Sequence, residues 1–280
     1  MVRLSEQIKQ ANLSEKEQAI VDKILGDISN TVFLSGAQLA EYCGVSAPYI
    51  TRLVRKLGYG KFSEFKEVLN EQYRCLISPY EMFQSFSSDS DMGDVVKETI
   101  LQDIRNISSL EKTLDTAELD RAVEAIDQGT TVYGAAIFAS EIAVHLLEHY
   151  LWRLNKPFEA MTGIGLSKKL EFSGIGSDDV LIAFSSQRVL KEVRDAAIFA
   201  RRRGATVIAV TDNAANPLAS VSDIVLLAPV TGVSIDYTHV ATLTMIDLLI
   251  NSLAQKNPER IQSHLSIEVK NCNSRDLFCL

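Results

Sequence analysis

The stretch that decides the fold spans residues 34–58 and reads LSGAQLAEYCGVSAPYITRLVRKLG. It predicts two short helices joined by a three-residue turn at 44–46. Gly44 is expected to end the first helix, because a left-handed residue at a helix C-terminus costs glycine no Cβ clash. Ser46 is expected to cap the second helix through its side chain, and Pro48 is tolerated in the first turn of that helix.

The second helix of this stretch has two different faces. Its apolar residues recur at i, i+3, i+4 and i+7, and this spacing predicts a buried stripe of Ile50, Leu53, Val54 and Leu57. Polar and cationic side chains occupy the opposite face. This layout is typical of a helix-turn-helix, in which one helix braces the other against DNA. An ordinary two-helix corner with a solvated basic face fits the same pattern and stays open.

The polar face of this helix supplies the candidate DNA-binding residues. Side chains in its N-terminal half are predicted to reach base edges, and the cations that follow are predicted to contact phosphate. The base-facing candidates are Ser46, Tyr49, Thr51 and Arg52, and the phosphate-facing candidates are Arg55, Lys56 and Lys61. The expected partner is double-stranded operator DNA, read by a homodimer or homotetramer through half-sites about one helical turn apart.

Charge is unevenly distributed along the chain. The 280 residues carry a net charge of −8, which would count against nucleic-acid binding if it were spread evenly. Residues 1–77 hold 10 Lys and Arg against 9 Asp and Glu, a net charge of +1, and the remaining residues hold 18 against 27, a net charge of −9. DNA binding is therefore expected to use a local patch, with the acidic remainder kept away from phosphate.

Composition also indicates in which compartment the protein is found and whether it binds a metal or a cofactor. The chain has no apolar run of about 18 residues, which predicts no membrane span, and residues 1–7 lack a signal-peptide core. We therefore expect a cytoplasmic protein. The cysteines form no C-x-x-C pair and are expected to be free thiols; they are Cys43, Cys75, Cys272 and Cys279. No metal and no cofactor is implied.

The order of elements predicts two domains. Residues 1–77 are expected to form an all-helical domain, with a capping box at Ser14 and Glu17, a break at 29–31 and a further helix from Phe62. Residues 78–94 are poor in order signals and read as a linker. The expected boundaries are 1–77 for the helix-turn-helix domain, 78–106 for the linker and a connecting helix, 107–255 for an α/β domain and 256–280 for a tail.

The sequence changes character from residue 130 onward. Apolar strands are expected at 131–136, 179–185, 205–211 and 224–227. They alternate with amphipathic helices at 141–154, 189–203 and 239–254, and two more helices, at 94–114 and 116–127, precede them. Continuous apolar strands between helices predict an α/β doubly wound parallel sheet that is covered on both faces. Such sheets bind ligands at the carboxyl ends of their strands.

The two domains together resemble the RpiR family of bacterial transcription regulators. The N-terminal match rests on the segments LSEKE at 13–17, AQLAE at 37–41, GVS at 44–46, LVRKLGY at 53–59 and FSEFK at 62–66. The C-terminal part is similar to the family's SIS (sugar isomerase) domain through RRRGATVIAVTD at 201–212, NPLA at 216–219 and IDLL at 246–249. The resemblance implies operator binding by the first domain and sensing of a phosphosugar by the second.

The resemblance also implies a phosphate cradle built from two loops. The first loop usually reads G-x-G-x-S, and the matching segment 136–140 keeps Ser140 but has lost both glycines. The second usually reads S-x-S-G-x-T, and the segment 185–190 keeps only its first serine. Either Arg188 compensates with a bidentate phosphate contact, or the crevice binds something else or nothing. The implied ligand residues are Ser140, Ser185, Ser186, Gln187, Arg188, Thr238 and His239.

Two alternative functions remain open. One is a sugar-phosphate aldose–ketose isomerase with a fused helical domain, for which Glu141 and His239 are the candidate bases. The other is a regulator whose SIS domain dimerises without a ligand. Residues 145–149 also fit the H-x-x-E-H pattern of a zinc protease. This helix belongs to a doubly wound sheet, however, so we interpret the stripe that His145 and His149 share with Ile142 and Trp152 as a subunit contact.

Overall fold

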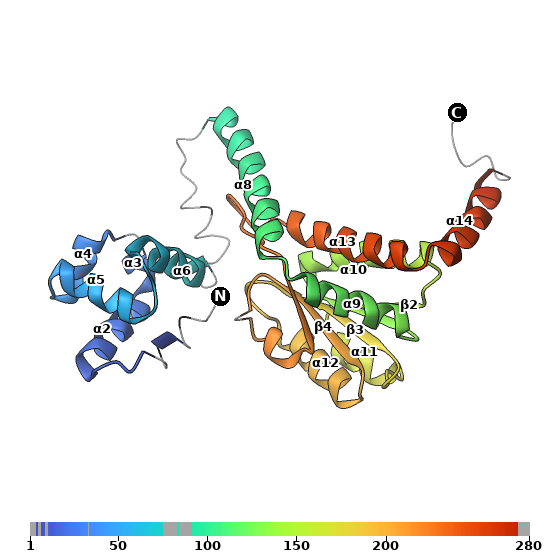
Figure 1. The fold of residues 1–280 in the computed structure, drawn as a ribbon, viewed down its shortest axis with the longest axis horizontal. Coiled ribbons are helices and arrows are strands. Elements are labelled where there is room, and N and C mark those ends of the chain that lie inside the picture. The colour runs from blue at the N-terminus through green and yellow to red at the C-terminus, as the bar shows by residue number, and fades with distance from the viewer. Residues whose placement is uncertain are drawn as a thin grey trace. The chain divides into compact units, whose positions relative to one another are not determined.

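The computed structural model describes residues 11–32, 34–74, 91–214 and 216–273, together with Leu4, Gln7, Ile8 and Phe83. The chain divides into two compact units, residues 1–82 and residues 83–280 (Figure 1). Of the predicted linker, only Phe83 and residues 91–94 lie within the described residues. None of the described helices is both long and apolar enough to cross a membrane.

Unit 1 is all-helical, as the sequence predicts. Its described helices are α2 (Glu15–Gly26), α3 (Ile28–Thr31), α4 (Gly36–Cys43), α5 (Ala47–Lys56) and α6 (Phe62–Arg74). Their apolar faces meet in one core, in which Leu39 and Leu69 are fully buried. The capping box at the start of α2 is confirmed, because the Glu17 backbone N–H donates to the Ser14 hydroxyl and the Glu17 carboxylate accepts from the Ser14 N–H.

The predicted break at 29–31 is wrong in position. The chain leaves helical geometry at Asp27, where φ is −128°, and residues 28–31 form the short helix α3. Thr31 explains why this turn stays helical. Its hydroxyl is buried and donates to the Ile24 carbonyl at 2.8 Å, which ties α3 back onto α2. A β-branched residue that looks like a breaker in the sequence therefore joins two helices.

Unit 2 contains a five-stranded parallel sheet in the order β2-β1-β3-β4-β5. The strands are β1 (Val132–Ala136), β2 (Phe158–Thr162), β3 (Val180–Phe184), β4 (Thr206–Thr211) and β5 (Ile224–Leu227). β1 is hydrogen-bonded to β2 on one side and to β3 on the other. After β2 the chain therefore crosses back to the far side of β1 and continues through the sheet in the opposite direction. The doubly wound α/β fold class is confirmed, and the carboxyl ends of β1 and β3 form its topological switch point.

Helices cover both faces of this sheet (Figure 1). One face packs against α9 (Thr116–Gln128), α10 (Glu141–Arg153) and α13 (Val240–Lys256), and the other against α11 (Leu166–Phe172) and α12 (Lys191–Arg202). Two further helices, α8 (Met92–Thr113) and α14 (Pro258–Asn273), contact α13. The side chains between the sheet and its helices therefore form two separate apolar cores, one on each face of the sheet.

One strand and two α-helices of unit 2 were not expected from the sequence. β2 is an edge strand in which Met161 is buried and Glu159 is exposed, so it lacks the continuous apolar run of the central strands. The short helix α11 follows it. Residues 258–273, left as an unassigned tail by the sequence, form α14, which begins at Pro258.

Candidate nucleic-acid interface and ligand crevice

The turn between α4 and α5 has the geometry that the sequence predicts. Gly44 ends α4 in the left-handed region, with φ of +68° and ψ of 34°, and its N–H donates to carbonyls of the last turn of α4. A second, unpredicted capping box starts α4. The Ser35 hydroxyl accepts from the Gln38 N–H, and the Gln38 side chain accepts from the Ser35 N–H. α4 is therefore stabilised at both ends.

The predicted side-chain cap at Ser46 is wrong. Ser46 occupies the N-cap position of α5 in an extended conformation, but its hydroxyl makes no capping hydrogen bond. Its backbone carbonyl instead accepts from the Tyr49 N–H at 2.9 Å. The exposed hydroxyl of Ser46 is therefore not engaged in capping its own helix.

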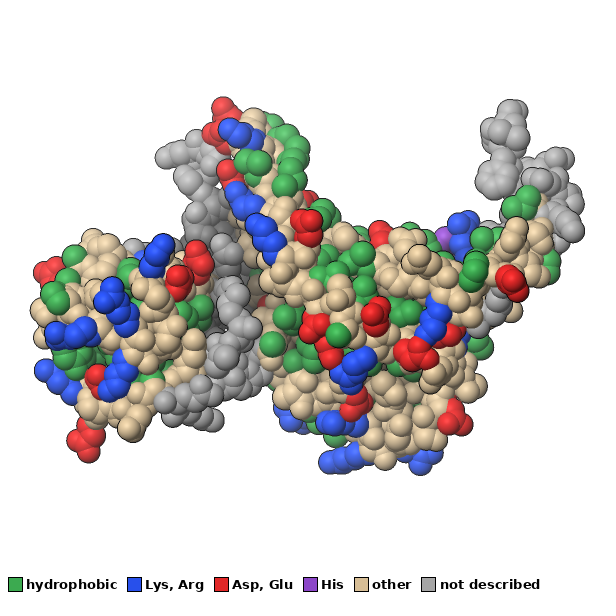
Figure 2. All heavy atoms as spheres, in the orientation of Figure 1, with side chains coloured by type: hydrophobic (Ala, Val, Ile, Leu, Met, Phe, Trp, Pro, Cys, Tyr) green, Lys and Arg blue, Asp and Glu red, His purple; other side chains and the backbone are tan. Residues whose placement is uncertain are grey.

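The two faces of α5 separate as predicted. Ile50, Leu53 and Val54 are buried in the core of unit 1. The predicted DNA-facing set is exposed except for Tyr49, which is half-buried; the exposed members are Ser46, Thr51, Arg52, Arg55, Lys56 and Lys61. Lys and Arg side chains are spread over the face of unit 1 that Figure 2 shows. The structure thus brings all seven predicted residues to the outer side of α5 and the loop that follows it.

Tyr49 lies between two cations. The Arg52 guanidinium carbon is 5.8 Å from the centre of the Tyr49 ring, and the Lys16 Nζ is 5.6 Å from it. Both distances are within the range of cation–π attraction. Lys16 could not be predicted from the sequence, because it belongs to α2 and reaches this surface only through the tertiary fold. Thr51 donates its hydroxyl to the Ala47 carbonyl at 3.2 Å, which leaves its oxygen lone pairs to accept from a base.

Lys56 differs from the other predicted phosphate contacts. Its Nζ lies 2.6 Å from the Glu17 carboxylate, so it already has an acidic partner within unit 1. Of Arg52, Arg55 and Lys56, only Lys56 has an ion pair in the described part of the chain. The hydrogen bond from Lys56, together with two from Ser14, lowers the pKa of Glu17 from 4.5 to about 2. Lys56 would have to exchange this carboxylate for a phosphate to contact DNA.

Replacing Lys56 with methionine is expected to raise the pKa of Glu17 toward 4.5 without reaching it, because the Ser14 hydrogen bonds remain. The folded-state pKa lies below the ordinary value. Ionised Glu17 therefore stabilises the fold above about pH 4.5, and this stabilisation is lost as the pH falls toward 2. Carboxyl-detected NMR titration of the full chain measures the shift. Lys61→Met is the matched control, and equal Glu17 titration curves in the wild type and Lys56→Met would contradict the assigned pair.

The predicted ligand residues lie on loops at the carboxyl ends of the strands. Ser140 follows β1 and precedes α10, and residues 185–188 follow β3 and lead to α12. Because β1 and β3 pair directly, these two loops flank the topological switch point. Ser185 is buried, Ser140, Ser186 and Gln187 are half-buried, and Arg188 is exposed. Ser140 occupies the N-cap position of α10, but its hydroxyl makes no capping hydrogen bond.

Each of these two loops contains a residue with a glycine-like backbone. Phe138 and Gln187 both have φ of +59°, a left-handed conformation that is uncommon for residues with a Cβ. In each case the N–H donates to a carboxylate, from Phe138 to Glu141 at 2.9 Å and from Gln187 to Asp212 at 3.0 Å. A backbone conformation of this kind costs free energy and persists only where the surrounding structure holds it in place. Such residues are found most often at ligand sites. Phe138 stands at one of the lost glycine positions of the first loop and keeps a backbone conformation that glycine adopts readily.

Asp212 and Asn216 form a support beneath the second loop. Asn216 is buried and donates to the Ser185 carbonyl at 3.3 Å and to Asp212 Oδ1 at 3.2 Å. Asp212 also accepts from the Gln187 N–H and the Thr211 hydroxyl. Neither residue was predicted to belong to the site, although both lie in the segments 201–212 and 216–219 that carry the resemblance to the SIS domain.

Thr238 and His239 lie where the chain returns from β5 to α13. The Thr238 hydroxyl accepts from the Val240 N–H at 3.4 Å, and the Thr238 N–H donates to the Val230 carbonyl at 3.2 Å. His239 is half-buried, and burial lowers its pKa while Asp236 opposes the shift. The hydrogen bond between Thr238 and Val230 therefore closes the loop that contains these two residues, directly before α13.

The loop from 231 to 237 has no room for a side chain at Gly232. A Cβ at this position would lie 1.8 Å from the Asp236 carbonyl oxygen, and no rotamer change can move a backbone atom away. Gly232→Ala is expected to destabilise unit 2 by about 1–3 kcal/mol through overpacking. Differential scanning calorimetry measures the loss. Gly176→Ala is the control, because its nearest atom is 3.9 Å away, and equal melting of the two variants would contradict the loop geometry.

The H-x-x-E-H segment does not form a metal centre in the described residues. His145 pairs with Glu148 at 3.5 Å, and no cluster of three His, Cys, Asp or Glu side chains in this part of the chain is arranged to hold a metal ion. The outward stripe on α10 is exposed, at 52% for Ile142 and 58% for Trp152. Trp152 contacts the edge of His264 from α14. A role of this stripe as a subunit contact stays a prediction.

A helix-turn-helix unit with an exposed cationic helix, joined to a doubly wound unit with two loops flanking its switch point, defines a two-domain DNA-binding regulator. The chain belongs to the RpiR family of these regulators. A family model described as helix-turn-helix domain, rpiR family, matches residues 3–74, and a model of the SIS domain matches residues 136–252.

Similar proteins extend over both units. The chain is 25% identical over 271 residues to the HTH-type transcriptional regulator HexR of Pseudomonas aeruginosa, covering 95% of this chain and 94% of that protein. The sugar isomerase domain of an RpiR transcription factor from Sphaerobacter thermophilus is 26% identical, with a TM-score of 0.59, over 62% of this chain and 97% of that one. The Vibrio vulnificus NanR protein, solved with ManNAc-6P, shares the fold at 24% identity, with a TM-score of 0.61 over 99% of both chains.

Proposed function

We propose that the protein binds operator DNA through α5 and regulates genes of carbohydrate metabolism in the cytoplasm. The observation that carries this proposal is the exposed polar face of α5, which holds Arg52 and Arg55 free of ion pairs in the described residues. Arg52 and Tyr49 would read base edges, and Arg55 and Lys61 would contact phosphate. Lys56 would also contact phosphate after its ion pair with Glu17 is broken.

The two loops that flank the switch point are the proposed sensor site. A phosphosugar or related anion would lie between Ser140 and residues 185–188, close to the N-termini of α10 and α12, where the helix dipole favours negative charge. Support comes from the family and from NanR, which was solved with ManNAc-6P. Arg188 would supply the cationic contact that replaces the hydroxyls missing from the second loop.

A regulator accounts for the chain better than the isomerase alternative. HexR, which is named as a transcriptional regulator, matches along nearly the whole chain. One candidate base of the isomerase reading, Glu141, accepts a hydrogen bond from the Phe138 N–H, so its carboxylate is engaged in the loop. A coupled isomerase assay on phosphosugars would separate the two functions, and we expect no turnover.

Removing the Arg188 guanidinium is expected to weaken phosphosugar binding about ten-fold or more, as for a charge-assisted hydrogen bond. Isothermal titration calorimetry of the full chain with a panel of phosphosugars measures this loss. Arg194→Ala, at an exposed site on α12, is the matched control and should bind like the wild type. If the wild type gave no heat of binding with any phosphosugar, the proposed sensor site would be wrong. If Arg188→Ala and the wild type bound with equal affinity, Arg188 would not contact the ligand.

A further inference from the structure

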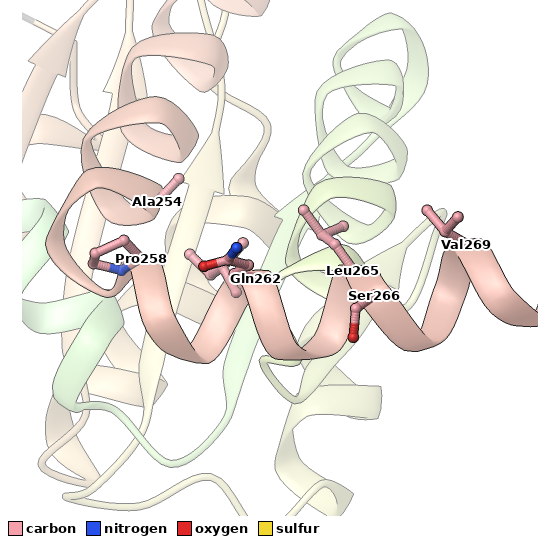
Figure 3. A pocket seen from close by; sticks show the side chains of 7 residues that line it. Ala254, Pro258, Gln262, Leu265, Ser266 and Val269 are labelled. Atoms are coloured by element: carbon pink, nitrogen blue, oxygen red, sulfur yellow. The ribbon is translucent and has the colours of Figure 1, made fainter.

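The proposed function gives no role to an apolar groove in unit 2 or to a carboxylate on unit 1. The groove lies where α13 meets α14, and its lining is apolar except for two residues (Figure 3). Nothing in the described residues shows what covers this groove. The carboxylate belongs to Glu17, which lies beside a helix whose partner is proposed to be DNA, so the chemistry that surrounds it is defined.

The first turn of α2 borders the proposed DNA-binding face of α5. Tyr49 and Lys56 are seven residues apart, so they lie on the same flank of α5. The Lys16 Nζ is 5.6 Å from the centre of the Tyr49 ring, and the Glu17 carboxylate is 2.6 Å from the Lys56 Nζ. Two consecutive residues of α2 therefore contact this flank, and one of them places a negative charge on a surface proposed to bind phosphate.

The Glu17 carboxylate is held in place by its own helix. Its Oε2 accepts from the Ser14 N–H at 2.8 Å and from the Ser14 hydroxyl at 2.9 Å, as part of the capping box of α2. These hydrogen bonds do not involve Lys56, so the carboxylate stays in place when Lys56 moves away. The carboxylate also stays ionised at neutral pH, because the hydrogen bonds from Lys56 and Ser14 lower the pKa of Glu17 to about 2.

A fixed carboxylate at this position competes with DNA phosphate for the Lys56 ammonium group. To contact phosphate, Lys56 must leave a partner at 2.6 Å, and the phosphate must then approach the charge of Glu17. Arg52 and Arg55 meet no such competition, because neither has an ion pair in the described part of the chain. The exchange of partners therefore costs free energy for Lys56 but not for the two arginines.

The base contact of Arg52 can offset this cost on a matching sequence. Arg52 lies four residues before Lys56, about 6 Å along the helix axis and on the same side of α5. When Arg52 binds a matching base, it holds α5 in the groove and brings Lys56 next to the DNA backbone. On a non-matching sequence only phosphate contacts hold the helix, so nothing offsets the exchange and Lys56 is expected to stay with Glu17.

We propose that Glu17 is a specificity-determining residue, which prevents Lys56 from contacting the phosphates of non-matching DNA. This inference rests on the proposed DNA-binding function. Each phosphate that a cation neutralises contributes about 0.9 to the slope of log affinity against log salt, which is about eight-fold in affinity between about 1 M and 0.1 M salt. By withholding one cation, Glu17 lowers the affinity for non-matching DNA about eight-fold near 0.1 M salt.

Glu17→Gln tests this role in the full chain, because glutamine preserves the capping box but carries no charge. Fluorescence anisotropy over a series of salt concentrations measures the affinity for a scrambled duplex of about two helical turns. The variant should bind this duplex about eight-fold more tightly near 0.1 M salt, with a slope steeper by about 0.9. Partial unfolding of unit 1 would weaken binding and cannot produce this gain. On a duplex with the motif that the wild type selects from a random-sequence library, the slope should stay unchanged.

Glu15→Gln is the matched control, because Glu15 is an exposed carboxylate on the same turn and has no ion pair in the described residues. It should leave the slopes for both duplexes unchanged. Glu17→Gln should also leave the slope for the scrambled duplex unchanged when Lys56 is already replaced by methionine.

Two results would overturn the proposal while leaving DNA binding by the wild type intact. One is an unchanged affinity and slope of Glu17→Gln on the scrambled duplex, and the other is an equal gain from Glu15→Gln. A wild type that binds neither duplex would refute the DNA-binding function itself, and this inference with it.

Discussion

Leu39→Ala is expected to melt unit 1 at least about 10 °C earlier than the wild type and to abolish DNA binding, while unit 2 keeps its melting temperature. Leu39 is fully buried in α4, at the centre of the core that holds α5 in place. Truncating a buried leucine costs about 2–5 kcal/mol, and each kcal/mol lowers Tm by roughly 4–8 °C in a domain of this size. A unit of 82 residues has little stability to lose.

Differential scanning calorimetry of the full chain separates this effect from a general loss of stability. The transition of unit 1 should move and that of unit 2 should stay. Glu41→Ala is the matched control, because Glu41 is an exposed side chain on the same helix. If Leu39→Ala melted like the wild type, or shifted both transitions equally, unit 1 would not be an independent domain built around this leucine.

Arg52→Ala is expected to lower the affinity for the operator about ten- to a hundred-fold, because a good bidentate contact to a base contributes about 1–3 kcal/mol of discrimination. Affinity for unrelated DNA should change much less. Arg52 is exposed and lies against Tyr49, so the variant should fold normally and lose one weak ring contact. Fluorescence anisotropy with operator and scrambled duplexes measures both affinities.

Arg55→Ala is the comparison that distinguishes base reading from phosphate contact. It should weaken operator and scrambled DNA equally and should reduce the slope of log affinity against log salt by about one. Lys56→Ala should have a smaller effect, because Lys56 already has Glu17 as a partner. Indistinguishable behaviour of Arg52→Ala and Arg55→Ala in both measurements would contradict the assigned roles.

The sequence predicts the parts of the fold that local rules determine. The left-handed Gly44, the buried stripe of α5 and the central strands follow from residue type and spacing, and the structure confirms them. β2 could not be predicted in this way, because an edge strand needs no continuous apolar run. The helix at 28–31 depends on a hydrogen bond from Thr31 to Ile24, which is a contact between elements and not a local preference.

In the candidate sites, too, local features follow from the sequence and contacts between distant residues do not. The exposed face of α5 follows from helical periodicity alone. The pairing of Lys56 with Glu17 and the approach of Lys16 to Tyr49 join residues 39 and 33 positions apart, and no pattern in the sequence marks them. The left-handed backbone of Phe138 and Gln187 likewise has no signal in the sequence, because it accompanies hydrogen bonds from their N–H groups to Glu141 and Asp212.

The central claim is that α5 reads a specific DNA sequence, and selection from a random-sequence duplex library tests it most directly. The full-length wild type should enrich one motif of two half-sites about one helical turn apart. Arg52→Ala should recover the same motif with the preference lost at one base pair of each half-site. Recovery of no sequence above the input by the wild type, or an identical motif from Arg52→Ala, would contradict the account.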